Sequence, residues 1–204
     1  MSDRRHGIPP PATTSIVDPL TWDPRAVSGS RYDAALFADV DLSDFEDRGA
    51  SFNACTFRGI RFNASAHIDA AFTNCTFVGC NFFDVHFTRC KLVGSTFDRC
   101  TFDLLAVEGG DWSLVALPGA DLRKATFHGV RLREADLTGA RFEGASVRDA
   151  DLSGALMRGA SFHGADLRGS DLSALDPRLC DVVDALIDVE QAMVIAVALG
   201  LRIG

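Results

Sequence analysis

Several features are scarce in this sequence, and each scarcity excludes a class of protein. No run of 18 apolar residues occurs, so no segment is long enough to span a bilayer as a helix. Basic residues are fewer than acidic ones, 20 against 28, and the net charge of −8 argues against a nucleic-acid-binding protein and favours a basic partner, or simply solubility. No CxxC motif occurs among the six cysteines, and His67 and His86 are irregularly placed, so we expect neither a metal site nor a cofactor.

In place of these features the sequence has a period of five between residues 30 and 174. Of the 29 positions there whose numbers end in 2 or 7, 27 are apolar, and the exceptions are Asp47 and His67. Two residues earlier, at numbers ending in 0 or 5, only small or apolar residues occur. We call the positions whose numbers end in 2 or 7 the central positions, and those whose numbers end in 0 or 5 the small positions. A period of five fits neither a strand nor a helix, and it predicts a solenoid whose stacked units bury one apolar column.

Individual blocks resemble a known repeat. Ala120-Asp121-Leu122 and Ala135-Asp136-Leu137 open two blocks that match A(D/N)LXX, the motif of the pentapeptide repeat family. The resemblance implies an all-β solenoid, a right-handed quadrilateral parallel β-helix in which each pentapeptide forms one face and four make a coil of about 20 residues. The aspartate before each central residue belongs to the motif, and we expect its side chain to hydrogen-bond backbone amides at turns.

The ends of the chain depart from the repeat, which divides the sequence into three parts. Residues 1–29 are proline-rich, have balanced charges and lack the apolar core of a signal peptide, so we expect a mobile N-terminal arm, with residues 16–22 docked on the first coil as one option. Residues 30–175 are expected to form the β-helix. Residues 176–204 follow a break at Asp176-Pro177 and are expected to form a C-terminal capping and dimerisation helix.

The C-terminal part predicts one short α-helix. Asp188 is its expected N-cap and Gln191 completes a capping box, while Gly200 ends the helix after Leu199. The helix is apolar all round, so one side can cover the open end of the solenoid and the other needs a partner. The simplest partner is the same helix of a second chain, with residues 201–203 adding a strand; the alternative is a monomer whose helix lies flat on its last coil. The expected dimer interface is Val189, Ala192, Met193, Ile195, Ala196, Val197, Leu199, Leu201 and Ile203.

The two polar central residues and the cysteines are the other candidates for chemistry. Asp47 and His67 are 20 residues apart, so we expect them on one face of neighbouring coils. Either they form a buried pair capable of proton transfer, or the chain bulges, Phe45 replaces Asp47 in the core and both polar groups turn to water. We favour the bulge, and we expect no enzyme because a filled solenoid offers no pocket. Five cysteines at the small position are expected to be buried free thiols: Cys55, Cys75, Cys80, Cys90 and Cys100.

Charge is concentrated at the two ends of the repeat. The net charge is −5 over residues 31–47, +2 over 48–148 and −5 over 149–204. Outward carboxylates on stacked coils recur regularly and would attract a basic partner with an affinity that falls with salt. The acids expected to bind such a partner are Asp136, Asp149, Asp151, Asp166, Asp171, Asp176, Asp181 and Asp184.

Residues 31–204 also resemble the MfpA and Qnr branch of the family, through Asp41-Leu42-Ser43, residues 72–77 and the ending 188–204. The resemblance implies a homodimeric rod, joined through its C-terminal helices, that mimics DNA, binds the DNA-binding saddle of the DNA gyrase A subunit, inhibits gyrase and protects it from fluoroquinolones or natural gyrase poisons. The unbroken period leaves no room for the projecting loops of Qnr, so gyrase binding is better supported than protection. We expect a cytoplasmic protein that binds neither DNA nor membranes; the alternative function is a scaffold with a non-gyrase partner.

Overall fold

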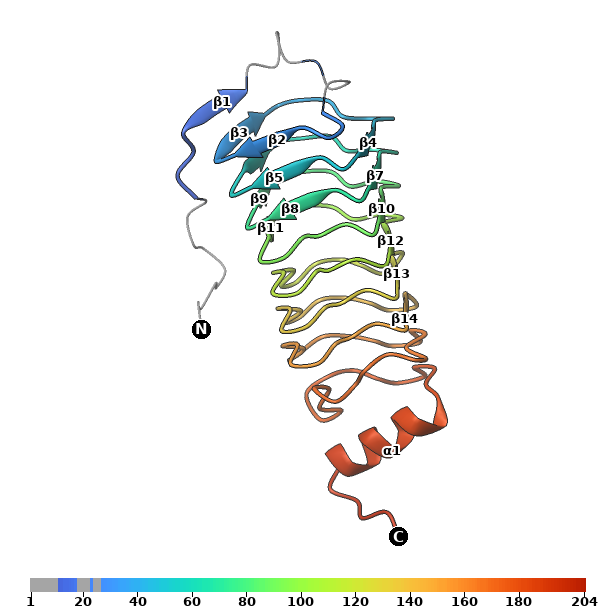
Figure 1. The fold of residues 1–204 in the computed structure, drawn as a ribbon. Helices are drawn as coiled ribbons and strands as arrows, with labels where there is room; N and C mark the ends of the chain where they lie inside the picture. The colour runs from blue at the N-terminus through green and yellow to red at the C-terminus, as the bar shows by residue number, and fades with distance from the viewer. Residues whose placement is uncertain (1–10, 18–22, 24–26) are drawn as a thin grey trace.

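In a computed structural model the chain forms a long stack of four-sided coils that ends in one short helix (Figure 1). The structure describes all residues except 1–10, 18–22 and 24–26. Parallel pairs join residues 20 positions apart, as Phe37 pairs with Phe57 and Phe57 with Phe77. Four pentapeptides therefore make one coil, and the expected quadrilateral all-β solenoid is confirmed.

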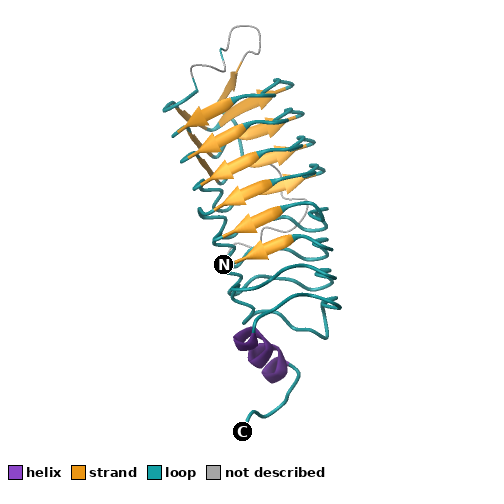
Figure 2. Ribbon diagram, turned by 90° about the vertical axis from the view of Figure 1, so that its right-hand side faces the viewer, coloured by secondary structure: helices purple, strands orange, loops and turns teal. Residues whose placement is uncertain are grey.

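The four pentapeptides of a coil form four faces, which we number in chain order; Figure 2 shows their strands stacked in parallel. Face 1 contains β2 (Arg31–Asp33), β5 (Ser51–Asn53) and β8 (Ala71–Thr73). Face 2 contains β1 (Ser15–Val17), β3 (Ala35–Ala38), β6 (Thr56–Arg58), β9 (Thr76–Val78) and β11 (Thr96–Asp98). Face 4 contains β4 (Glu46–Arg48), β7 (Ala66–Ile68), β10 (His86–Thr88), β12 (Ala106–Glu108), β13 (Thr126–His128) and β14 (Ser146–Arg148). Face 3, between faces 2 and 4, is joined by single parallel bridges from Asp41 to Thr101 and again from Asp121 to Asp181.

The central and small positions fill the interior of the stack. Central phenylalanines of successive coils lie with their rings parallel, 4.8 Å apart between Phe57 and Phe77 and 4.7 Å apart between Phe77 and Phe97. Trp112 is fully buried at its central position, as the period predicts. The central side chains of each coil, aromatic or aliphatic, pack on those of the next coil, so one continuous apolar core runs along the stack.

The N-terminal part joins the solenoid wherever the structure describes it. β1 pairs in parallel with β3, Val27 is buried, and Gly29 N–H donates to Arg48 O at 2.9 Å. These described residues are built into the first coil and do not form the mobile arm expected for residues 1–29. The expected docking of residues 16–22 is seen for Ile16 and Val17, while residues 18–22 lie outside the described part.

At the other end the coils continue past residue 175, the expected end of the β-helix. Parallel bridges join Ser161 to Asp181 and Asp166 to Leu186. In the described chain face 2 stops earlier, at Leu156, and the next residue of that column, Asp176, directly precedes Pro177. The predicted break at Pro177 is therefore local, and the boundary of the solenoid lies later than predicted.

Helix α1 (Val189–Ala198) follows the last coil directly. Its capping box is present as predicted: the Asp188 carboxylate accepts from Gln191 N–H, and the Gln191 side chain accepts from Asp188 N–H. Leu199 is the C-cap, and Gly200 follows with φ +86°. Residues 201–203 have no regular structure in the single chain.

Candidate functional site

The acids expected to bind the partner are spread around the whole rod. Two of them lie on each face: Asp151 and Asp171 on face 1, Asp136 and Asp176 on face 2, Asp181 and Asp184 on face 3, Asp149 and Asp166 on face 4. They surround the C-terminal half of the solenoid, and they do not form one continuous acidic surface.

Most of these acids have a structural role, as the motif predicts. The carboxylate before a central residue accepts a hydrogen bond from the amide two residues later, for example Asp136 from Thr138 N–H at 3.0 Å and Asp171 from Ser173 N–H at 2.8 Å. The same bond is made by Asp151, Asp166, Asp176 and Asp181. These aspartates hold the turns of the coil as well as carrying charge.

Ion pairs neutralise part of the acidic charge. Asp166 lies 2.8 Å from Arg168, and the hydrogen bond from Arg168 lowers the pKa of that carboxyl. Arg178 lowers the pKa of Asp176 in the same way. The carboxylates thus stay ionised at any physiological pH, but their fields are partly cancelled by the neighbouring guanidinium groups.

Face 3 is the most acidic side of the rod. From residue 31 to residue 188, its outward and corner positions carry eight acids and four bases, whereas face 1 carries five and four, face 2 four and four, and face 4 six and four. The face 3 acids are Asp41, Asp44, Asp84, Asp103, Asp121, Glu143, Asp181 and Asp184. This excess follows from the register of 20 residues and is invisible in a plot of charge along the chain.

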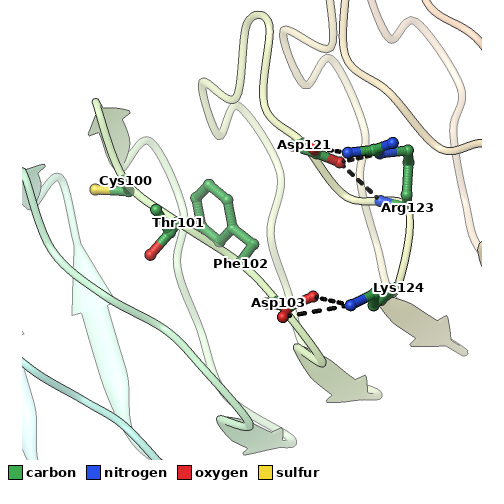
Figure 3. Close-up of a pocket in the computed structure, with 7 residues that line it drawn as sticks. All are labelled: Cys100, Thr101, Phe102, Asp103, Asp121, Arg123 and Lys124. Carbon is green, nitrogen blue, oxygen red and sulfur yellow. Dashed lines mark hydrogen bonds and ion pairs between the residues drawn. The ribbon is translucent and has the colours of Figure 1, made fainter.

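Face 3 is also interrupted at one level. Above this level, toward the N-terminus, Phe82 N–H donates to Thr101 O at 2.9 Å. Below it, toward the C-terminus, Leu122 N–H donates to Arg141 O at 2.8 Å. Between them the bridge expected from Thr101 to Asp121 is missing from the described chain, although faces 1, 2 and 4 are continuous there. A hollow of about 480 Å³, which we call the face 3 gap, opens at this level; Figure 3 shows its lining of Cys100, Thr101, Phe102, Asp103, Asp121, Arg123 and Lys124.

Two exposed apolar side chains lie on face 3 on the two coils directly above the gap. Phe83 is 42% exposed and Leu104 is 45% exposed. Asp84 N–H donates to Asp103 O at 2.9 Å, which places Phe83 and Asp84 directly above Asp103 and Leu104. The repeat pattern did not lead us to expect this cluster, although a signal was present: both apolar residues occupy outward or corner positions, which the repeat reserves mainly for small and polar residues.

The C-terminal helix has one covered and one open side. Gln191 is its most buried residue, and its side-chain amide donates to Leu167 O at 2.6 Å and to Ser170 O at 2.7 Å. Ile195 packs against the core and Ala196 is half-buried. The other expected interface residues are exposed, namely Val189, Ala192, Met193, Val197, Leu199, Leu201 and Ile203. The helix therefore caps the solenoid and leaves an apolar side uncovered in the single chain.

Asp47 and His67 are buried, so the favoured bulge is wrong. Their exposed fractions are 0% and 1%, they pair in register between β4 and β7, and His67 Nδ1 contacts Asp47 Oδ2 at short range. His67 Nε2 lies 3.1 Å from the hydroxyl of Ser65, which is also buried. Each polar group finds a partner inside the core, which removes the reason to turn outward. The three side chains line up as in a hydrolase, but they are sealed from any substrate.

The cysteines of the described chain are free thiols. Cys55, Cys75, Cys80 and Cys90 are buried as predicted, and burial raises the pKa of Cys90 to about 12. Cys100, which was also predicted to be buried, is only half-buried because it lines the face 3 gap. Among the residues that the structure describes, no group of three or more His, Cys, Asp or Glu is arranged to hold a metal ion. No helix in the described chain has the length and apolarity that a membrane crossing requires.

The fold defines the protein as a parallel β-solenoid built from pentapeptides. A profile described as "Pentapeptide repeats" matches eight copies at residues 68–103, 108–139 and 135–173. The chain belongs to the pentapeptide repeat family.

Solved structures of the same fold include full-length QnrB1, a plasmid-mediated fluoroquinolone resistance protein. It is 19% identical, with a TM-score of 0.50 over 93% of this chain and 97% of that one. HetL, a pentapeptide repeat protein involved in heterocyst differentiation regulation in Nostoc sp. strain PCC 7120, is also 19% identical, with a TM-score of 0.26 over 78% and 87%. No curated protein matches the sequence. At these identities the likeness concerns the fold alone.

Proposed function

We propose that this protein is a homodimeric DNA mimic that binds DNA gyrase through its A subunit saddle. In this proposal it inhibits the enzyme and protects it from fluoroquinolones or natural gyrase poisons. It acts in the cytoplasm, has no catalytic activity of its own and binds neither nucleic acid nor membranes. The observation that carries the proposal is the C-terminal end of the rod, where an uncovered apolar helix is surrounded by acidic coils.

The helix supports the dimer. Val189 is 79% exposed and Val197 is 60% exposed, so the side of α1 turned away from the solenoid presents apolar groups to water. A monomeric protein rarely leaves such a patch uncovered. The same patch on a second chain is its simplest cover, because a twofold contact is self-complementary. Two rods then lie end to end and form one longer rod.

The acidic coils support the DNA mimicry. Residues 149–204 carry a net charge of −5, and an end-to-end dimer would bring two such blocks to its centre. Carboxylates on stacked coils recur at roughly the strand spacing of 4.8 Å along a rod. A basic DNA-binding surface would be attracted to them by the same counterion release that favours DNA. The fold of the fluoroquinolone resistance protein QnrB1 is compatible with this function.

A second function, a scaffold with a non-gyrase partner, is favoured by the ion pairs. Among the proposed binding acids, Asp149, Asp166 and Asp176 each lie within 3.0 Å of a His or Arg nitrogen, and Asp151 and Asp181 have longer pairs. The arginine pairs of Asp151, Asp166 and Asp176 lower the effective negative field that a DNA mimic needs. A scaffold would bind through shape and apolar contacts, and its affinity would depend little on salt.

A gyrase supercoiling assay separates the two functions. The purified protein is titrated into gyrase from a high-GC bacterium at about 50 mM and about 200 mM salt. Dose-dependent inhibition that weakens at the higher salt supports the DNA mimic, and a fluoroquinolone added to the same assay then tests protection. Absence of inhibition at tens of micromolar protein would leave the scaffold. A variant with Met193→Asp and Val197→Asp, analysed by sedimentation, tests whether the rod dimerises through α1.

A further inference from the structure

We infer that face 3 is the side of the rod that contacts the partner, and that the face 3 gap receives one extended basic segment of it. The inference rests on the proposed function, because it takes that partner to be gyrase. It differs from the proposal above in placing the contact on one face, in the middle of each rod, instead of on the acids surrounding the C-terminal half.

The first support is the unpaired backbone in the gap. By the pattern of the neighbouring levels, Phe102 N–H would donate to Asp121 O, and Asp121 N–H would donate to Cys100 O. Neither bond is formed within the part of the chain that the structure describes. Unpaired strand edges are templates for an added strand. A hollow of about 480 Å³ lies in the range of a ligand pocket and far above the space of one water molecule.

The second support is the pair of apolar side chains on the two coils directly above the gap. Phe83 and Leu104 lie on adjacent coils, and both leave more than two fifths of their surface exposed. Away from the two ends of the rod, the other large exposed apolar residues, Leu114 and Leu156, stand singly on faces 1 and 2. A partly exposed aromatic next to a concave site is the usual anchor of a protein interface.

The charge of face 3 as a whole favours a basic occupant. Face 3 has four more acids than bases. In the gap itself Asp103 and Asp121 pair with Lys124 and Arg123, so the excess comes from the acids of the neighbouring coils, such as Asp84. Lys124 crosses the gap to Asp103 at 3.1 Å, as the lower dashed lines of Figure 3 mark. Both side chains are about half exposed or more, so this ion pair is weak and an arginine of the partner can replace Lys124 at the carboxylate. An extended segment that carries arginine or lysine beside an apolar residue fits all three features.

The test compares two double variants in the supercoiling assay. Phe83→Ser with Leu104→Ser removes the anchors of face 3, and Leu114→Ser with Leu156→Ser removes equally exposed apolar groups elsewhere. All four side chains are exposed, so both variants should melt like the wild type. We expect the face 3 variant to need about tenfold more protein for half-inhibition, and the control less than about twofold more. Inhibition by the face 3 variant at wild-type concentrations overturns the inference and leaves the proposed function intact.

Amide hydrogen exchange gives a second, independent result. In the free protein the Phe102 amide should exchange faster than the Phe82 amide, which donates to Thr101 O on the next coil. Adding the gyrase A subunit should protect residues 101–105 more strongly than the matching residues 96–100 on face 2. Equal protection of the two segments overturns the inference. A wild-type protein that neither inhibits nor binds gyrase removes the proposed function and this inference with it.

Discussion

The coils above the face 3 gap and those below it pack the same repeat with different side chains. Above, phenylalanine rings stack between coils, and strands form on three faces. Below the gap the central and small positions are mostly Leu and Ala, and Phe142 and Phe162 are the one parallel phenylalanine pair among the described residues of that region. Strands in that region are found on face 4, as β13 and β14. Rings 4.7 to 4.9 Å apart match the spacing of paired strands, so the aromatic stacks reinforce the backbone ladder. The gap opens where this reinforcement ends.

The largest expected effect is a loss of stability caused by a substitution in the core of the upper coils. His67→Phe leaves the carboxyl of Asp47 buried without its partner and should lower the free energy of unfolding by about 3 to 5 kcal/mol. Adding Asp47→Leu removes the orphaned group, and the double variant should recover most of the loss. Urea denaturation of the wild type and both variants measures this. A single variant as stable as the wild type would mean that the pair is not buried as described.

The second effect is a loss of stability caused by a substitution at the boundary between the two regions. Gly110 occupies a small position with φ +92°, and a Cβ there would collide with Cys90 O and lie 2.8 Å from Cys90 N. Gly110→Ala should therefore cost about 3 kcal/mol or more, because both atoms belong to rigid backbone. Gly129→Ala is the matched control: it has positive φ but open space, and should cost about 1 kcal/mol. Equal melting temperatures of the two variants would contradict the close approach of Gly110 to the backbone of Cys90.

The third effect sharpens the contrast between the cores. Phe77→Leu removes two parallel stacks, with Phe57 and Phe97, whereas Phe142→Leu removes one, with Phe162. Since each aromatic pair contributes about 0.5 to 1.5 kcal/mol beyond its buried area, the upper variant should be less stable than the lower by about 1 kcal/mol. Denaturation midpoints of the two variants test this, and the reverse order would remove the proposed role of stacking.

The smallest effect is on pH dependence. Hydrogen bonds from Arg123 and Arg168 lower the pKa of Asp121 and Asp166 in the lower coils. A folded-state pKa below the unfolded value of about 3.9 contributes stability above that pH and loses it as the pH falls further. Hydrogen bonds from Arg61 and Arg89 lower the pKa of Asp41 and Asp69 in the upper coils as well, so acid weakens both regions below about pH 4. The stacked phenylalanine rings of the upper coils do not titrate, and the lower coils should therefore lose amide protection first. Exchange rates corrected for their intrinsic pH dependence measure the order, and simultaneous loss would show that the two regions unfold as one.

Much of the fold could be predicted because the repeat is local. The central and small positions, the capping box of Asp188 and Gln191, and the turn role of the motif aspartates are each visible within a few residues. The errors arose where a residue departs from the motif. Pro177 suggested that the solenoid ends there, whereas bridges on faces 3 and 4 continue past it. Asp47 and His67 suggested a bulge because each looks like an isolated polar residue in the sequence, and their contact joins residues that are 20 positions apart.

The sequence by itself determined that this chain is a pentapeptide solenoid with an apolar column, an acidic end and a capped terminal helix, because a fixed period dictates which side chains turn inward. Only the tertiary structure decided that Asp47 and His67 are paired inside, that acids from eight distant positions gather on face 3, and that this face is open beside Phe83 and Leu104. These features depend on which coil lies against which, and stacking brings together residues that the linear order keeps 20 positions apart.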